Sequence, residues 1–227
     1  MGTLNKTVLG RVTGAVGDIV FRSKNGKNYV SSKPANVKVS NSQIALAARA
    51  KFRICIKFAQ AVAYNQMIKS LWLSAKPQYM SAANFIFRTN YTHITSTDVS
   101  NSASLVPGFG FSLVSPVIDI NSTRLRVTLD AITADSGINP ATEPNLRLAA
   151  VLVLTSPLNS GMFPYDFIPL SSPEVATVFD TPVNFTANLN SQQAQLFSQY
   201  QTVKAFCTIV SLNSENSVVH FATTFVG

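Results

Sequence analysis

The sequence predicts an α+β, mainly β fold: an N-terminal β-hairpin arm and one long helix, followed by an immunoglobulin-like antiparallel β-sandwich. Three observations predict it. A helical pattern runs without interruption over Asn41–Trp72, an Asn-Gly pair stands between two β-rich runs near the N-terminus, and short β-rich runs alternate with turn residues from Gly108 onward. These features divide the 227-residue chain into an arm (1–40), a helical segment (41–90) and a sandwich (108–227).

The arm is predicted to contain a β-hairpin. Asn25-Gly26 lies between the β-rich runs Asp18–Ser23 and Asn28–Ser32, and an Asn-Gly pair in that position favours a two-residue type I′ turn. Glycines at positions 2, 10, 14 and 17 precede the hairpin and let the backbone turn tightly or approach another surface closely. Because an isolated hairpin is only marginally stable in water, we expect it to dock on the sandwich, on the helix or on a neighbouring subunit.

The stretch Asn41–Trp72 is predicted to be one helix, with Asn41 or Ser42 as its N-cap. On a helical wheel most of the circumference is apolar, which predicts a largely buried helix. Lys51 falls inside the apolar arc, and we expect it to extend its methylenes along the surface or to pair with an acid. The remaining polar residues form one narrow stripe: Arg49, Arg53, Lys57, Gln60 and Tyr64. This stripe is either a solvated face or a binding surface.

Several motifs fall in the first third of the chain. They are Gly14-x-x-Gly17-Asp18-Ile-Val-Phe-Arg22, Asn25-Gly26-Lys27-Asn28-Tyr29-Val30, Ser32-Lys33-Pro34 and Arg49-Ala50-Lys51-Phe52, with Asn84-Phe85 and Asn90 downstream. Together they resemble a domain-of-unknown-function family that is abundant in Bacteroidota bacteria and their mobile elements. The resemblance implies a bacterial or phage source and a helix-plus-β-sandwich fold. It implies no activity, cofactor or catalytic residue.

A second, shorter helix is predicted over Met80–Phe87. The Ser-, Thr- and Asn-rich stretch Asn90–Pro107 is predicted to be a loop that separates the helical segment from the sandwich. The predicted strands are Phe109–Val114, Arg124–Ile132, Arg147–Thr155, Phe167–Leu170, Val175–Phe179, Val183–Leu189, Val203–Leu212 and Val218–Phe225. Seven or eight strands at this spacing are typical of an immunoglobulin-like sandwich. Ser191–Gln199 is predicted to form a helical turn between two of them.

Composition and charge point to a covered surface. Hydrophobic residues make up 46% of the chain and charged residues only 12%, so we expect other copies or another protein to cover part of the surface. The net charge of +8 is unevenly distributed. Residues 1–90 carry fourteen basic residues and one acid, whereas residues 91–227 carry four basic residues and nine acids. This asymmetry indicates either nucleic-acid binding by the first part or head-to-tail attraction between unlike parts.

No motif for catalysis or for cofactor binding stands out. The two histidines, His93 and His220, are far apart and have no cysteine or acid at metal-ligand spacing. We therefore expect no enzyme activity, no cofactor and no metal, with His220 as a strand residue and the nine acids solvated in turns. Cys55 and Cys207 lie among apolar residues, which predicts two buried thiols and not a disulfide.

The sequence therefore predicts a non-enzymatic structural or assembly protein that self-associates through its basic N-terminal arm and helix against the acidic β-sandwich. It would be a component of a phage virion or a related particle. The alternative is a nucleic-acid-binding protein that uses the basic hairpin and the helix stripe. A monomer with internally balanced charge and a sandwich that binds another ligand are also left open. The candidate interaction residues are Arg22, Lys24, Lys27, Lys33, Lys38, Arg49, Arg53 and Lys57.

The expected partners are other copies of the chain or a larger protein assembly, with nucleic acid in the alternative and no membrane. The first ten residues hold no apolar run typical of a secretory signal, and no segment reaches the ~18 apolar residues of a membrane helix. The expected location is the cytoplasm, or a particle such as a virion assembled there.

Overall fold

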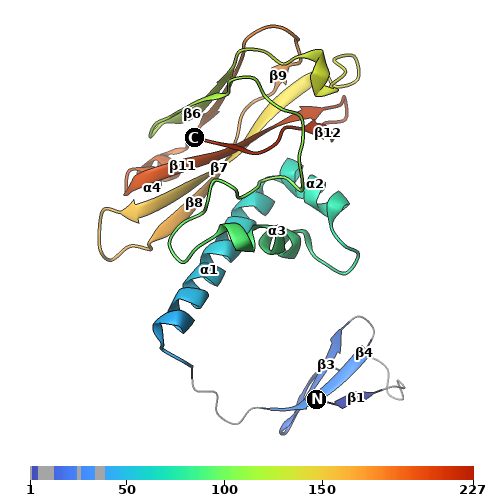
Figure 1. Ribbon diagram of the computed structural model, residues 1–227, viewed down its shortest axis with the longest axis vertical. Helices are drawn as coiled ribbons and strands as arrows, with labels where there is room; N and C mark the ends of the chain where they lie inside the picture. Colours follow the sequence, from blue (N-terminus) through green and yellow to red (C-terminus); the bar gives the residue numbers. More distant parts are fainter. Residues whose placement is uncertain (1, 5–12, 25–26, 34–38) are drawn as a thin grey trace. The chain divides into compact units, whose positions relative to one another are not determined.

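The computed structural model describes two compact units, Met1–Leu46 and Ala47–Gly227, which we consider separately. Within them it describes the backbone of residues 2–4 and all atoms of residues 13–24, 27–33 and 39–227 (Figure 1). The α+β, mainly β fold class predicted from the sequence is confirmed.

The first unit contains a four-stranded antiparallel sheet in the order β1-β4-β3-β2. Its strands are β1 (Gly2–Leu4), β2 (Gly14–Val16), β3 (Ile19–Lys24) and β4 (Lys27–Ser32). The predicted hairpin is present, since β3 and β4 pair antiparallel with Lys24 opposite Lys27. The proposed turn at Asn25-Gly26 lies outside the described residues. We call this sheet the arm sheet.

Strands β1 and β2 were not predicted. Residues Gly17 and Asp18 connect β2 to β3, with Val16 opposite Ile19. Of the two turn residues, Gly17 alone has a positive φ, +57°, and a glycine at the first central position is what a type II′ hairpin turn requires. Of the two roles that the sequence allowed for this glycine, a tight turn or a close approach to another surface, the structure shows the tight turn.

The second unit contains a β-sandwich with immunoglobulin-like strand order. One sheet has the order β10-β6-β5, and the other has β12-β11-β7-β8, with β13 paired to β11 and β9 to β7. The strands are β5 (Val117–Ile120), β6 (Arg124–Leu129), β7 (Asn145–Pro157), β8 (Tyr165–Ser171), β9 (Val175–Ala176), β10 (Val183–Asn188), β11 (Tyr200–Leu212), β12 (Val218–Phe221) and β13 (Phe225–Val226). The first, second and fifth long strands thus form one sheet and the others the second, as in immunoglobulin-like domains.

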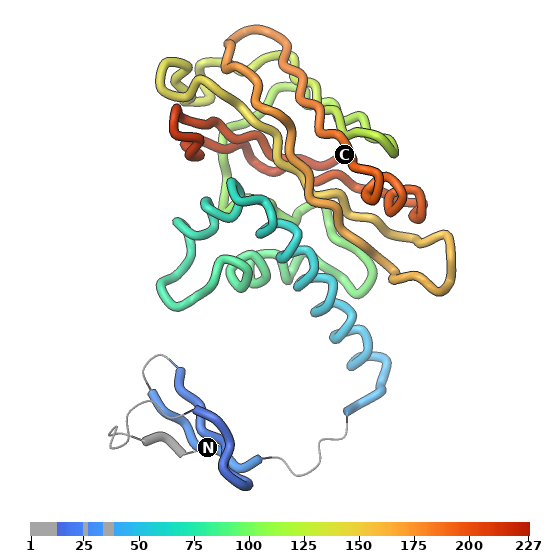
Figure 2. The backbone as a smooth tube through the Cα atoms, turned by 180° about the vertical axis from the view of Figure 1, so that it is seen from behind, coloured from blue at the N-terminus to red at the C-terminus, as the bar shows by residue number. Residues whose placement is uncertain are grey.

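The longest strands, β7 and β11, form the centre of the second unit. They pair from Tyr200 opposite Pro157 to Leu212 opposite Asn145. Because side chains alternate across a strand, neighbouring residues enter different cores: Val151 belongs to the helix-facing core and Leu152 to the core shared with β6 and β10. The large sheet is therefore the middle of three layers, with helices on one face and the small sheet on the other (Figure 2).

The helical layer consists of α1 (Gln43–Tyr64), α2 (Gln66–Ala75) and α3 (Ala82–Asn90). The prediction of one helix over Asn41–Trp72 was wrong at Asn65. This residue is extended, and its side chain accepts hydrogen bonds from the Met67 and Ile68 amides, so it ends α1 and caps α2. The predicted cap of α1 is present at Ser42, whose Oγ accepts from the Ala45 amide at 3.3 Å.

Burial along α1 is uneven. Its buried residues begin at Ile54, where the helix starts to pack on the large sheet. In the preceding turns Ile44 is 84% exposed and Phe52 is 50% exposed. The prediction of a largely buried helix therefore holds only for the second half of α1, because the first half extends beyond the sheets that would cover it (Figure 1).

The expected boundary between helices and sandwich, at Asn90–Pro107, is not a boundary. The side chain of Asn90 donates to Ser104 O at 3.0 Å and accepts from Ser104 N at 2.7 Å. The Trp72 indole donates to Leu105 O at 2.7 Å, and Val99 and Leu105 are buried in the helix-facing core. Helices, connection and sandwich thus fold as one unit.

Several strand predictions needed correction. The predicted strand Phe109–Val114 contains one isolated bridge, from Phe111 to Ala222. There Gly110 approaches so closely that a Cβ atom would lie 1.9 Å from Phe221 O. Strand β5 was missed because its short, exposed sequence gives little signal. Helix α4 (Ser191–Phe197), predicted as a turn, begins with a capping box between Asn190 and Gln193.

Candidate interaction surfaces

The structure places the candidate basic residues in two groups. Four belong to the first unit, with Arg22 and Lys24 on β3, Lys27 on β4 and Lys33 just after β4. Arg49, Arg53 and Lys57 lie on α1, and Lys38 is outside the described residues. The two groups are therefore separate surfaces, each of which is described by itself.

The strand register gives the arm sheet two different faces. Cross-strand partners share a face, and alternate residues point the same way. Ile19, Phe21 and their neighbours Val16 and Val30 lie on one face, which we call the apolar face. Arg22 pairs with Tyr29 and Lys24 with Lys27 on the other, which we call the basic face. The alternation of residues in the sequence already places Ile19 and Phe21 on one face of the hairpin, and the register adds which cations lie on the other.

The apolar face is poorly covered. Val16 is 70% exposed and Ile19 is 46% exposed, while Phe21 and Val30 are half-buried. Among residues 13–24, 27–33 and 39–46, no apolar side chain is buried, and Asn28 is the one buried residue. A sheet needs a buried apolar face for independent stability, and within these residues the arm sheet has none.

The second basic surface lies on α1. The predicted stripe is mostly solvent-accessible, since Arg53 and Lys57 are exposed and Arg49 is half-buried. Beside it is an open hollow of about 630 Å³, lined by Ala48, Arg49, Phe52, Arg53, Ile56, Lys57, Gln60 and Tyr91. Phe52 packs edge-on against Phe87 at 5.0 Å between ring centroids. The hollow thus combines three cations with two accessible aromatic rings, and we call it the α1 hollow.

Lys51 makes a contact that was not predicted. Its Nζ lies 4.4 Å from the centroid of the Tyr91 ring, which is a cation–π contact. The sequence could not show this contact, because Tyr91 follows α3 and reaches α1 only through the tertiary packing of the two helices.

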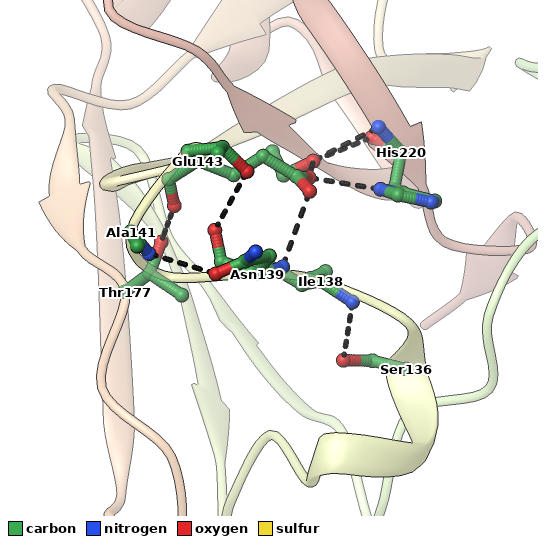
Figure 3. Close-up of polar contacts among 9 residues, drawn as sticks. Ser136, Ile138, Asn139, Ala141, Glu143, Thr177 and His220 are labelled. Carbon is green, nitrogen blue, oxygen red and sulfur yellow. Dashed lines mark hydrogen bonds and ion pairs between the residues drawn. The ribbon is translucent and has the colours of Figure 1, made fainter.

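The structure also contains a buried acid, although all nine acids of residues 91–227 were predicted to be solvated. Glu143 is only 3% exposed. Its carboxylate accepts from the Asn139 amide at 3.1 Å and from the Ser211 hydroxyl, and it contacts His220 Nδ1 at 2.8 Å (Figure 3). Its carbonyl oxygen accepts from the Thr177 hydroxyl at 2.7 Å. The position within a Pro- and Thr-rich turn gave no signal of burial.

Glu143 forms hydrogen bonds with strands and connections that are far apart in the chain. Asn139 belongs to the β6–β7 connection, Ser211 to β11, His220 to β12 and Thr177 to the segment after β9. Burial acts to raise the pKa of the Glu143 carboxyl. The hydrogen bonds from Ser211, His220 and Asn139, together with the charge of His220, outweigh this effect and hold the pKa below its usual value.

Ser211 and His220 do not form a Ser–His nucleophile and base pair, because no hydrogen bond joins the Ser211 hydroxyl to the His220 ring. Ser211 also has no exposed surface from which to reach a substrate. Here the buried Ser211 hydroxyl donates to the carboxylate and accepts from the His220 backbone amide at 2.9 Å. We therefore interpret the network as structural. The prediction that His220 is a strand residue is confirmed, since it lies in β12.

Both cysteines are buried free thiols, as predicted. Burial raises the pKa of Cys55 to about 11, against a smaller opposing effect of Lys51, and burial also raises the pKa of Cys207. Because the thiolate is the reactive form, neither thiol is suited to nucleophilic chemistry near neutral pH.

Within the described part of the chain, no three His, Cys, Asp or Glu side chains are grouped closely enough to hold a metal ion. No helix in the described ranges carries an apolar stretch long enough to cross a lipid bilayer.

Comparison with known proteins identifies no family for this chain. No protein-family model matches the chain, and no curated protein sequence matches it significantly. Among solved structures, it is similar to DesR, a β-glucosidase from Streptomyces venezuelae in complex with D-glucose, at 12% identity and a TM-score of 0.24. The match covers 54% of this chain and 16% of the glucosidase. A score this low supports no conclusion about function, and the resemblance to the Bacteroidota family stays a prediction.

Replacing Glu143 with Gln tests the buried network. At pH 7 we expect Glu143→Gln to lower the free energy of unfolding by about 1–3 kcal/mol, because buried hydrogen-bond partners lose a charged acceptor. The folded-state pKa lies below the unfolded value of about 4.3, so the wild-type advantage is present above that pH and lost as pH falls through the folded pKa. Urea unfolding from pH 7 to pH 3 measures this.

The exposed acid Glu215 provides the matched control. Glu215→Gln should change the free energy of unfolding by less than about 0.5 kcal/mol. A Glu143→Gln difference that is the same at pH 3 and pH 7 would contradict the assignment of a stabilising carboxylate.

Proposed function

We propose that this chain is a non-enzymatic structural subunit that self-associates through its arm sheet and the first half of α1 against the acidic sandwich of other copies. It would form part of a particle such as a phage virion. The observation that carries this proposal is that, within the described residues, the arm sheet folds without a single buried apolar side chain.

A small sheet is stable only when the burial of apolar surface offsets the cost of ordering its backbone. Ordering a residue's backbone costs roughly 1–2 kcal/mol, and burial of apolar surface returns about 25 cal/mol per Å². The arm sheet has apolar side chains on one face but leaves them half or fully exposed. Covering this face with another protein surface would supply the missing burial, and the low overall charge of the chain suits such coverage.

The first half of α1 supports the same proposal. Ile44, Leu46 and Phe52 are all exposed, and Ile44 lies on the side of the helix that is buried further along, at Cys55, Phe58 and Val62. Exposed apolar side chains gathered on one element mark interaction surfaces more often than isolated ones do. A subunit in an assembly contacts several neighbours, and two separate apolar surfaces suit that role.

Removal of apolar surface from the arm sheet tests self-association. Val16→Thr with Ile19→Thr keeps β-branched residues in the strands but removes apolar surface. We expect the dissociation constant of the oligomer to rise roughly tenfold or more, which corresponds to about 1.4 kcal/mol. Light scattering across a concentration series would show the mass falling toward the 24.5 kDa monomer.

A matched control removes exposed apolar surface elsewhere. Leu73→Gln with Leu158→Gln alters α2 and the β7–β8 connection, where the leucines are also about half exposed, and should leave the mass unchanged. A wild-type protein that is monomeric at every concentration would refute the proposal, as would equal masses for the wild type and the arm variant.

Nucleic-acid binding is the second candidate, and the α1 hollow is the observation that favours it. Arg49, Arg53 and Lys57 stand beside the accessible rings of Phe52 and Tyr91. Cations that contact phosphates and rings that stack on bases are the two components of single-strand binding surfaces.

Charge reversal on α1 tests this second candidate. Arg49→Glu with Arg53→Glu should abolish binding to a fluorescent single-stranded oligonucleotide in anisotropy titrations. Each phosphate contact of the wild type should add roughly 0.7 to the slope of log affinity against log salt. Lys69→Glu with Arg88→Glu makes the same change of charge away from the hollow and should retain binding. Retained affinity of the α1 variant at low salt, with unchanged circular dichroism, would eliminate this function.

A further inference from the structure

One end of the sandwich carries a concentration of acids. The strand register brings three connections to this end, because Leu129 lies opposite Val183 and Asn145 opposite both Ala176 and Leu212. The connections are residues 130–144, 172–182 and 213–217. Figure 1 shows them gathered around β9 and the start of β12. We call this region the acidic end, after its exposed acids Asp130, Asp135, Glu174, Asp180 and Glu215.

Hydrogen bonds and an ion pair hold parts of the acidic end in place. The buried Glu143 network joins connection 130–144 to Thr177 of connection 172–182, and also to β11 and β12 (Figure 3). One basic side chain, Arg147, is held locally: its Nε donates to Ser172 O at 2.7 Å, and its guanidinium lies 3.9 Å from Glu174. The other exposed acids are not offset in this way by any ion pair found among the described residues.

The basic face of the arm sheet carries an excess of positive charge. Lys24 and Lys27 are directly opposite each other, and like charges in that relation destabilise a sheet. Arg22 lies on the same face, opposite Tyr29. All three cations are exposed. Anionic groups placed over this face would relieve the repulsion, and Tyr29 would add an aromatic surface to the contact.

We propose that the basic face of the arm sheet docks on the acidic end of a neighbouring copy of this chain. This inference rests on the proposed self-association and identifies the surface that receives the arm. Charge complementarity selects the partner, because two acidic ends repel one another, as do two basic faces. The apolar face stays available to a further neighbour.

The geometry of α1 favours a neighbouring copy over the same chain. Tyr64, at the end of α1, shares a hollow with Arg147 and Ser171 near the acidic end, so the turns of α1 that precede Tyr64 run away from the acidic end. A helix of 22 residues spans about 33 Å. Ten residues separate Ser32 from Gln43, and they span at most about 36 Å when fully extended. For the arm sheet to reach the acidic end of its own chain, these ten residues would have to run almost fully extended along α1.

The arm sheet is the donor, and the acidic end of another copy is the receiving surface, so the two contacting surfaces are different. Such a contact is heterologous, and repetition produces a ring or a filament. This arrangement matches the uneven charge of the sequence without requiring nucleic acid.

A charge-swap experiment on the full chain tests the inference. The arm variant is Lys24→Glu with Lys27→Glu, and the end variant is Asp135→Lys with Glu215→Lys. Each variant alone should assemble at least tenfold more weakly than the wild type in light scattering at low salt. An equimolar mixture should regain assembly, because each mutated surface then meets a complementary one. The four substitutions combined in one chain should also assemble.

The outcomes separate the two proposals. If the wild type assembles and the Val16→Thr, Ile19→Thr variant does not, self-association through the arm holds. If the mixture and the combined variant then fail to recover, with circular dichroism unchanged, the acidic end is not the receiving surface. A wild-type mass that never exceeds that of the monomer overturns both.

Discussion

The pairing of β7 with β11 is the constraint on which the second unit depends. Thirteen-residue strands pair along their whole length, and both of their faces are buried. One face supplies Val151 and Phe206 to the helical core, and the other supplies Leu152 and Cys207 to the core of the sandwich. Removing either layer would expose a continuous apolar surface, so helices and small sheet are held by the same two strands. The middle layer also sets the acidic end, because connection 130–144 leads into β7, connection 213–217 follows β11, and connection 172–182 contains β9, which pairs with β7.

The two units differ in how they are stabilised. The second has two apolar cores, whereas the described residues of the first contain no buried apolar side chain. A sheet with an apolar face and a basic face can make one contact through burial and another through charge. Burial supplies affinity, and charge selects the partner and its orientation. This division would suit a subunit that must recognise copies of itself in a fixed head-to-tail order.

Periodic and turn signals in the sequence predicted most of the fold. The β-rich run Arg147–Thr155 predicted the strand β7, and the turn spacing predicted the sandwich. Features that depend on one side chain in a tertiary setting were missed. Asn65 interrupts a pattern without Gly or Pro, and Glu143 becomes buried only because Ser211 and His220 converge on it. The basic residues were identified individually, but their division between two surfaces required the register of β3 and β4 and the course of α1.

The most direct test of the account is amide hydrogen exchange of the full chain across the concentration range in which light scattering follows assembly. If assembly proceeds through the arm sheet, the amides of β3 and β4 should exchange rapidly in the monomer and more slowly as the oligomer forms. The amides of β7 and β11 should be protected throughout, because their protection comes from the core of a single copy. Exchange rates in β3 and β4 that stay the same while the mass increases would contradict assembly through the arm sheet.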